Sequence, residues 1–371
     1  MLNDNIIVPS HEFKFIAGNK IFLQQNDLDP LSIMSKLWCG WLLADRFGIL
    51  NKYSPYRIAD RKDVFPTASK TPIVFSDILD NKICEIVSKY EKIVVSWSGG
   101  VDSTAVVVGL LKNIPQHQYN RITVVCATPS IEEAPRFYQM LLDQKIKVIV
   151  TNNIIHDLSN VNCDCILSGW CADQLFGSDI LAADKSCYNK KWLDGLKITF
   201  DQSPFRLSES SFDILGEVYS NYINQLGIEI EQWCEFAWLF NFAIKFSYIE
   251  KAMALTIHGT KNEGKGVNVF DDFAFQTYAV THYSQIRTNN GYDDPLYYKL
   301  PLKQYIHEYT NDQDYLIRKG KRNSWAYTKS RLESVKVLTD KGTKTFTIDQ
   351  DKMSQCGFYN LSYKVGDSFR K

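Results

Sequence analysis

The chain has 371 residues, of which 45% are hydrophobic, so it can form one large domain or two medium domains with a substantial core. Its 42 Lys and Arg residues balance its 42 Asp and Glu residues, and this zero formal charge argues against a protein that mainly binds nucleic acid or a membrane surface. No apolar run approaches the ~20 residues that span a bilayer, and the nine scattered cysteines, without a signal peptide, fit reduced thiols. We therefore expect a cytoplasmic protein with no membrane partner.

Residues 1–74 carry the weakest pattern, and we expect an N-terminal segment of unclear fold. Residues 13–22 alternate as a hairpin does, and residues 31–43 have helical spacing. The stretch Asp45-Arg46-Phe47-Gly48-Ile49 resembles a short segment of glutamine amidotransferase domains. A glutaminase of that type needs a Cys directly after the initiator Met, where this chain has Leu2, so we expect no glutaminase activity from the chain itself.

Helical and strand patterns alternate over residues 75–200. Helices are predicted over residues 74–90, after Gly100, and over residues 131–144, where Ser130 and Glu133 form a capping-box pattern. Strands are predicted at residues 92–97, 121–127, 145–150 and 164–168. This alternation is typical of parallel strands with right-handed crossovers, in which ligands bind at the carboxyl ends of the strands.

Residues 201–371 are predicted to be mainly helical, which makes the fold class α/β, with a parallel-sheet core followed by a helical C-terminal region. The helices are expected at residues 219–227, 230–254, 273–286 and 302–309, with a Gly/Lys loop at 259–266 and a short strand at 343–348.

The first strand runs directly into a glycine turn, Ser98-Gly99-Gly100-Val101-Asp102-Ser103, and then into a helix. Two glycines let the backbone approach a ligand closely, and the N–H groups of the turn and the positive end of the helix dipole favour an anion. Asp102 is suited to hold a divalent cation that neutralises phosphate oxygens. The turn lacks the Gly-Lys-Ser/Thr of a Walker A loop and the spacing of a dinucleotide fingerprint. We expect a pyrophosphate cradle built from Ser96, Ser98, Gly99, Gly100, Asp102, Ser103 and Thr104.

A second turn of small residues with an acid follows the fourth strand, in Ser168-Gly169-Trp170-Cys171-Ala172-Asp173-Gln174-Leu175-Phe176-Gly177. In a parallel sheet this turn can face the first one. Asp102 and Asp173 would then share one Mg²⁺, which takes one or two protein carboxylates together with phosphate oxygens and water. Ser168 and Gly169 would join the nucleotide-binding surface.

The Ser-Gly-Gly-x-Asp-Ser turn resembles the signature of the PP-loop ATP pyrophosphatases, which cleave ATP between the α and β phosphates. The second motif resembles the Ser-Gly-Glu-Gly-Ala-Asp-Glu-Leu-Phe-Gly motif of asparagine synthetase and β-lactam synthetase. The resemblance covers roughly residues 75–320, and it departs from that family at Trp170, Cys171 and Gln174, on the acceptor side of the pocket. It implies a PP-loop nucleotide-binding core at residues 75–200, ATP and Mg²⁺ as cofactors, and metal binding by Asp102 and Asp173.

Lys299-Leu300-Pro301-Leu302-Lys303 resembles the Lys-x-x-Leu-Arg of the same family, with Lys303 in place of the Arg. The resemblance implies that Lys299 is catalytic, and a preorganised ammonium would stabilise the charge that develops as an adenylate forms. Residues 269–272 resemble the family's Pro-Phe-Leu-Asp, and the basic segment 316–322 resembles one that faces the leaving phosphate. A solvated surface lysine and a solvated helix end are the alternatives for Lys299 and for this segment.

The resemblance predicts a ligase that activates a carboxylate or amide oxygen as an AMP ester, releases pyrophosphate, and passes the acyl group to an amine or ammonia. Its partners would be a small-molecule acceptor and a separate ammonia donor. Two alternatives stay open: a PP-loop enzyme that modifies a nucleoside or tRNA base, and a nucleotide-binding module without catalysis. Cys171, beside Asp173, is the candidate for sulfur transfer in the first alternative. Cys163, Cys165, Cys171 and Cys187 lack the paired spacing of a zinc site.

Overall fold

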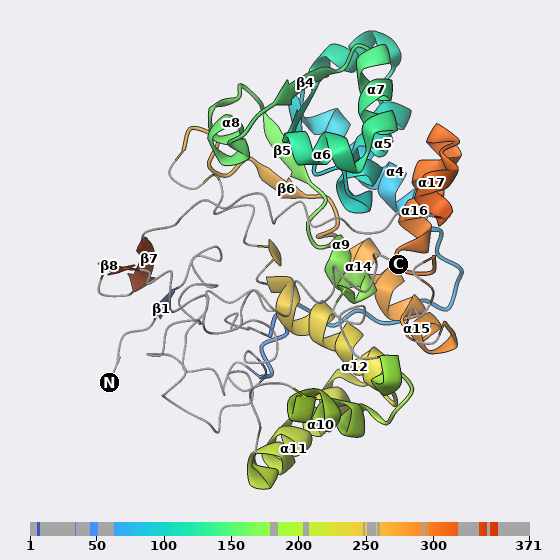
Figure 1. Cartoon of the computed structure of the whole chain (residues 1–371), viewed down its shortest axis with the longest axis vertical. Helices are drawn as coiled ribbons and strands as arrows, with labels where there is room; N and C mark the ends of the chain where they lie inside the picture. The colour runs from blue at the N-terminus through green and yellow to red at the C-terminus, as the bar shows by residue number, and fades with distance from the viewer. Residues whose placement is uncertain are drawn as a thin grey trace.

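A five-stranded parallel sheet lies at one end of the molecule, with helices around it (Figure 1). The computed structural model describes residues 45–50, 63–178, 185–202, 208–247, 249–250, 260–289, 296–317, 334–339 and 342–347, together with residues 6–7, 34, 257, 291 and 294. The strands are β2 (Ile93–Ser96), β3 (Ile122–Cys126), β4 (Lys147–Val150), β5 (Cys165–Ser168) and β6 (Gly266–Asn268).

The strand order, β4-β3-β2-β5-β6, places the switch in winding direction between β2 and β5. The chain moves outward on one side through β3 and β4, and then returns to pair β5 with the free side of β2 in parallel register. At such a switch point the connections after the two strands diverge and leave a crevice at their carboxyl ends. Both turns that the sequence singles out follow these two strands.

Alternating side chains divide the sheet between two hydrophobic cores. Ile93, Val95 and Leu167 belong to the main core, on the side where α5 packs against β2 and β5. Val94 and Ile166 belong to a smaller core that α8 covers. The helices of this part of the chain are α4 (Phe75–Lys89), α5 (Val101–Asn113), α6 (Thr128–Glu133), α7 (Pro135–Asp143), α8 (Ile154–Asn160) and α9 (Ala172–Phe176), with a 3₁₀ turn η2 (Gln116–Arg121).

The C-terminal region is helical (Figure 1). It is also rich in buried aromatic side chains. Its elements are η4 (Lys185–Cys187), α10 (Trp192–Gln202), α11 (Glu209–Leu226), α12 (Trp233–Phe240), the π-helix η5 (Asn241–Lys245), α14 (Phe273–His282), α15 (Gln285–Thr288), α16 (Leu300–Thr310) and α17 (Gln313–Ile317). Helix α16 returns to the sheet and packs against α4 and α5, the two helices beside strand β2 in the chain. The α/β class with a helical C-terminal region is thereby confirmed.

Several predicted elements differ in their bounds. The helix predicted at 131–144 is two helices, because Ala134 (φ −140°, ψ 64°) leaves the helical region before Pro135, as residues that precede proline tend to do. Ser130 therefore lies inside α6 and does not cap a helix that begins after it. Helix α8 and strand β6 were not predicted; β6 begins at Gly266, the last residue of the predicted Gly/Lys loop, and residues 261–264 of that loop form a turn.

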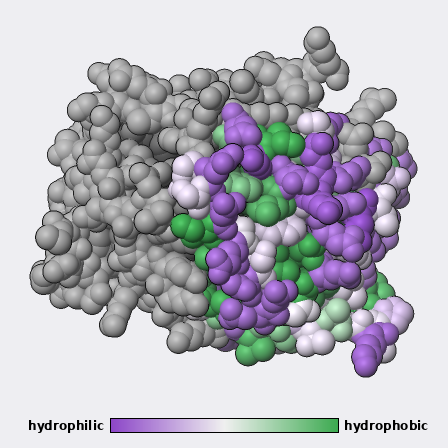
Figure 2. Space-filling model, turned by 90° about the horizontal axis from the view of Figure 1, so that it is seen from below, coloured by the Kyte–Doolittle hydropathy of each residue, from purple (hydrophilic) through white to green (hydrophobic). Residues whose placement is uncertain are grey.

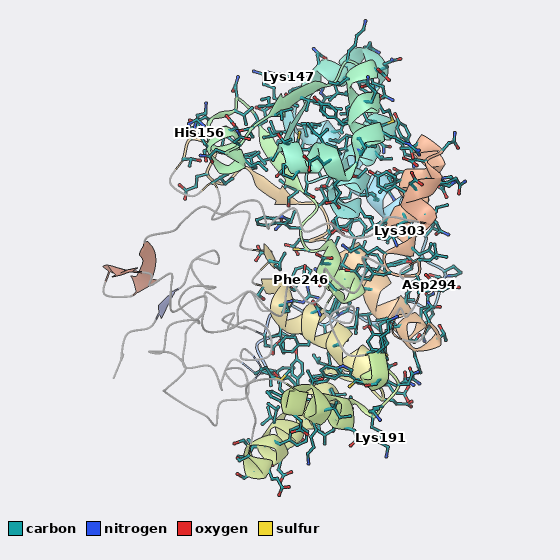
Figure 3. The ribbon with its side chains drawn as sticks, viewed as in Figure 1. Lys147, His156, Lys191, Phe246, Asp294 and Lys303 are labelled. Atoms are coloured by element: carbon teal, nitrogen blue, oxygen red, sulfur yellow. The ribbon has the colours of Figure 1, made fainter. Side chains whose placement is uncertain are left out.

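Residues 45–50 pack against the C-terminal helices. The guanidinium of Arg46 lies 4.1 Å from the ring centroids of both Phe242 and Phe246, the latter labelled in Figure 3. Asp45 accepts hydrogen bonds from the Tyr222 hydroxyl (2.8 Å) and from the Leu50 amide (2.9 Å). Burial raises the pKa of Asp45, although these hydrogen bonds oppose it. These contacts tie the N-terminal segment to the helical region.

A second, antiparallel sheet joins β1 (Ile6–Ile7), β7 (Ser334–Thr339) and β8 (Gly342–Thr347), so the strand predicted near residues 343–348 is present. The predicted hairpin at 13–22 and residues 318–322 of the basic segment lie outside the described residues, as does the predicted helix at 31–43 apart from Met34. Within the described part of the chain, no helix has the length and apolarity to cross a bilayer. The face drawn in Figure 2 carries apolar patches between hydrophilic side chains.

Candidate functional site

The first turn is shaped by Gly99, which has a φ of +75°. A Cβ at this position would lie only 2.3 Å from the backbone oxygen of Ser130, so glycine is required both by the left-handed backbone and by the space available. Helix α6 therefore lies directly against the turn. Gly100 forms the N-cap of α5 without any side-chain cap, which leaves the first amides of this 13-residue helix pointing toward the turn.

Two hydroxyl groups organise the interior of this turn. The Ser103 hydroxyl accepts a hydrogen bond from the Ser98 amide (3.1 Å), and the two serine hydroxyl oxygens are also 3.1 Å apart. The Ser98 hydroxyl in turn accepts from the Gly100 amide at 3.3 Å. The loop is thus held in one conformation before any ligand binds, which lowers the entropic cost of binding an anion.

The second turn lies against the first. A Cβ on Gly169 would meet the Ser103 amide nitrogen at 2.5 Å and the carbonyl carbon of Asp102 at 2.6 Å, so the two backbones are in van der Waals contact. Cys171, which follows, has a φ of +74° and precedes α9, whose first turn contains Asp173. The resembled family has Gly at the position of Cys171, and the left-handed backbone accounts for that preference.

Lys299 bridges the two aspartates across the crevice. Its Nζ lies 2.5 Å from Asp102 Oδ2 and 2.5 Å from Asp173 Oδ1, and its side chain is 6% exposed. The backbone of Lys299 is left-handed (φ 57°), where it forms the N-cap of α16. The Tyr298 hydroxyl donates a hydrogen bond to Asp173 Oδ1 at 2.7 Å. The structure therefore brings together three residues that the sequence predicted, and adds Tyr298.

The donor set at this point fits a divalent cation. Two carboxylates, from the helices that follow neighbouring strands, converge on one position, which the Lys299 ammonium fills as a positive stand-in. Among the residues that the structure describes, no group of three or more His, Cys, Asp or Glu side chains is placed to hold a metal, so these two carboxylates would be the protein ligands here. Two carboxylates match Mg²⁺, which keeps its other positions for phosphate oxygens and water.

The hydroxyl groups of two residues that were predicted to bind the nucleotide make hydrogen bonds behind the two turns. Thr104 is fully buried, and its Oγ1 accepts from Trp97 Nε1 (3.0 Å) and from the Tyr315 hydroxyl (3.4 Å). Ser168 is also buried, and its hydroxyl donates to Asn268 Oδ1 at 2.7 Å, which fastens β6 to β5. Their side chains therefore support the two turns from behind. Ser96, the last residue of β2, is half-buried at the base of the first turn.

The position of Thr104 makes a prediction about stability. Thr104→Val removes the hydroxyl that accepts the hydrogen bond from Trp97 Nε1, and this buried donor then lacks a partner among the described residues. The loss costs about 1–3 kcal/mol of unfolding free energy. We expect the affinity for Mg-ATP to stay the same. Thr104→Ser keeps the hydroxyl and should recover most of the loss. Urea unfolding and calorimetric titration of the three proteins measure both quantities. A large loss of nucleotide affinity in the Val variant without a loss of stability would contradict this assignment.

Lys303 lies one helical turn after Lys299 and is equally buried (Figure 3). Burial, and the neighbouring charge of Lys299, lower the pKa of Lys303 to about 8, while Asp294 acts in the opposite direction. Its Nζ lies 3.5 Å from the carbonyl oxygen of Leu296. An Arg, as in the resembled family, would remain charged here, so the Lys makes the charge behind the site dependent on pH.

This lowered pKa predicts a pH-dependent stability. In the unfolded chain Lys303 stays protonated up to a pKa near 10.5, whereas in the folded protein it loses its proton near pH 8. Between these values the unfolded state binds more protons, so the contribution of Lys303 to stability increases as the pH rises from 8 toward 10.5. The difference between the two pKa values corresponds to at most about 3 kcal/mol of unfolding free energy. Lys303→Met should be more stable than the wild type at pH 7, and the difference should shrink by pH 9.5. Equal differences at both pH values, measured by urea unfolding, would refute the prediction.

The structure gives several further residues a place that differs from the role predicted from the sequence. Glu133, expected to be a capping partner, lies beside the first turn, where its Oε1 would be 4.0 Å from a Cβ on Gly100. Asp272 caps α14 through the Ala274 amide (2.9 Å) and pairs with Lys82 (3.1 Å). Cys171 is 1% exposed, which disfavours its use as a surface nucleophile.

A comparison of the sequence with known proteins finds neither a matching family model nor a matching curated protein.

Proposed function

We propose that this protein is an ATP-dependent, adenylate-forming ligase whose site cleaves ATP between the α and β phosphates. The observation that supports this most is the convergence of Asp102, Asp173 and Lys299 at the switch point of the sheet, beside a glycine turn that opens a helix. A carboxylate is a poor electrophile, and its conversion to an acyl-AMP provides the good leaving group that an amine or ammonia can displace. The acceptor would be a small molecule that carries a carboxylate or amide oxygen.

The residues of the first turn would bind the pyrophosphate. The first amides of α5 supply N–H donors, and the hydroxyls of Ser98 and Ser103 lie at the same place. Asp102 and Asp173 would hold Mg²⁺, which neutralises phosphate oxygens and polarises the bond to be broken.

Lys299 would stabilise the charge that develops on the oxygen bridging the α and β phosphates. Its ammonium is buried and paired with both carboxylates, at the position from which it would move toward the phosphates. A charge that is preorganised in a site shielded from water stabilises a transition state more than a mobile surface lysine would. The Tyr298 hydroxyl would keep Asp173 oriented while Lys299 moves toward the phosphates.

Calorimetric titration with ATP, in the presence of Mg²⁺ and of EDTA, tests the binding part of this proposal. We expect Mg²⁺-dependent binding, and a loss of at least about tenfold in affinity, equivalent to about 1.4 kcal/mol, in both Asp102→Asn and Asp173→Asn. Asp194→Asn, which changes an exposed carboxylate on α10, serves as the matched control and should bind like the wild type. Binding that ignores Mg²⁺, or that survives both site variants, would overturn the assignment.

The structure gives less support to a sulfur-transfer reaction. Cys171 is buried against the main core, and its backbone is fixed in a left-handed conformation at the start of α9. A reactive thiolate is normally at least partly accessible. Tight ATP binding without formation of AMP would instead select a nucleotide-binding module without catalysis.

A further inference from the structure

A cavity separate from the residues of the nucleotide site lies among the helices of the C-terminal region. It has a volume of about 200 Å³, is partly open to solvent, and is lined by residues of α9, α12, α14, α15 and the start of α16. Figure 1 shows α9 and α14 close together between the sheet and α12. None of the residues assigned above to phosphate or metal binding lines this cavity.

Aromatic rings form much of the wall. Trp238 and Tyr283 stack with their centroids 4.8 Å apart at an angle of 18°, and Tyr278 and His282 stack at 4.1 Å. The polar atoms of two of these rings are already engaged, because Trp238 Nε1 donates to the Leu175 carbonyl (2.9 Å) and the Tyr283 hydroxyl donates to a backbone carbonyl (2.6 Å). Trp238 is almost fully buried and also stacks on Phe242, so the ring surface open to a ligand is that of the more exposed His282, Tyr283 and Tyr297, on which a planar ring can stack.

Uncharged polar groups complete the lining. The side-chain amides of Gln285, Asn289 and Gln304 line the cavity, and none of the three makes a hydrogen bond within the described part of the chain. His282 Nδ1 lies 2.9 Å from the Tyr278 carbonyl, which can only accept, so Nδ1 carries the proton and Nε2 of the neutral ring is an acceptor. Among the residues that the structure describes, the lining contains no Asp, Glu, Lys or Arg.

We propose that this cavity is a second binding site, which takes an uncharged, planar ligand of one or two rings with an amide or similar polar edge. The volume is adequate, since an engineered cavity of about 150 Å³ in another protein holds benzene. Stacked aromatic walls select a planar ring, and the three amides and His282 offer donors and acceptors for its polar edge. A charged ligand is disfavoured, because transferring an ion out of water without a charged partner costs several kcal/mol.

The position of the cavity links it to the elements that carry the nucleotide site without making it part of that site. Leu175 and Phe176 of its lining follow Asp173 in α9, and Tyr297 and Leu300 flank the pair Tyr298 and Lys299. A bound ring would therefore contact both segments from which the cation site is built. The proposal goes beyond the ligase function and does not depend on it.

Benzamide and benzoate, which share a ring and differ in charge, provide the test. Saturation-transfer NMR with the full chain, without nucleotide, should show benzamide binding, with benzoate binding at least tenfold more weakly. Ala279→Phe fills the cavity and should weaken benzamide binding at least tenfold, whereas Ala274→Phe, on the exposed side of the same helix, should not. Ala279→Leu is the smaller filling variant if the Phe variant unfolds.

Three results would overturn the proposal: no benzamide binding by the wild type, equal binding of benzoate, or unchanged binding in both filling variants. Asp102→Asn should bind benzamide as the wild type does, so a failure of the ATP site and a failure of this cavity give different results.

Discussion

Lys299→Met is expected to lower the AMP-forming turnover of ATP by about 10²- to 10³-fold, which is the range found when one preorganised transition-state donor is removed from an enzyme. Lys299 is only 5% exposed, and its ammonium contacts both aspartates. Met has a similar length, so the substitution removes the charge with little change in side-chain volume. Quantifying AMP and pyrophosphate with an acceptor pool measures the effect.

The same variant should have the opposite effect on metal binding without nucleotide. In the wild type the Lys299 ammonium fills the position between Asp102 and Asp173 that a cation would take. Its removal leaves two carboxylates that repel each other, and we expect Mn²⁺ affinity to rise by about tenfold, or about 1.4 kcal/mol.

Electron paramagnetic resonance of free Mn²⁺ measures this affinity. Lys303→Met removes a positive charge one turn further along α16, and it controls for a general change in local charge. We expect a smaller effect from it than from Lys299→Met. If Lys299→Met weakened Mn²⁺ binding, or if it left turnover intact, Lys299 could not have the two roles assigned to it.

Gly169→Ala should reduce both stability and nucleotide affinity. The added Cβ would lie 2.5 Å from the Ser103 amide nitrogen and 2.6 Å from the Asp102 carbonyl carbon, and both neighbours are backbone atoms that cannot rotate away. Overpacking of this kind costs about 1–3 kcal/mol, and the two turns must separate to relieve it. We expect ATP affinity to fall by at least about tenfold, or 1.4 kcal/mol, because Asp102 and Asp173 move apart.

Gly216→Ala is the matched control for this substitution. The three atoms nearest to its Cβ belong to the side chain of Leu193, the closest at 3.2 Å, and Ala has the higher helix propensity inside α11. This control should be at least as stable as the wild type. Chemical unfolding and calorimetric titration distinguish the two variants. A Gly169→Ala protein with native stability and native ATP affinity would show that the two turns do not meet as described.

The sheet strands next to the site were predictable because their sequences carry the information locally. β2, β3 and β5 are short β-branched or apolar runs, of which β2 and β5 end in serine, and these runs are buried on both faces. Strand β6 is different, since Gly266–Asn268 has no apolar run and forms through pairing with β5 and the hydrogen bond between Ser168 and Asn268. An edge strand of this kind depends on a partner 100 residues away in the sequence.

The sequence predicted which residues meet at the two turns better than it predicted the direction of their side chains. Ser103 and Thr104 are adjacent in α5, and a helix turns about 100° for each residue, so one hydroxyl faces the turn while the other faces the core. The sequence pattern predicted the same binding role for both residues. Tyr298 could not be identified, because its hydrogen bond to Asp173 joins residues 125 positions apart and follows no local spacing.

The products formed from ATP labelled at the α-phosphate provide the most direct test of the proposed site. With a mixed pool of carboxylate acceptors and ammonia, the wild type should form labelled AMP and equimolar pyrophosphate, and Asp102→Asn should form neither. Labelled ADP with inorganic phosphate, or no labelled AMP from a wild-type protein that binds Mg-ATP, would contradict an adenylate-forming site.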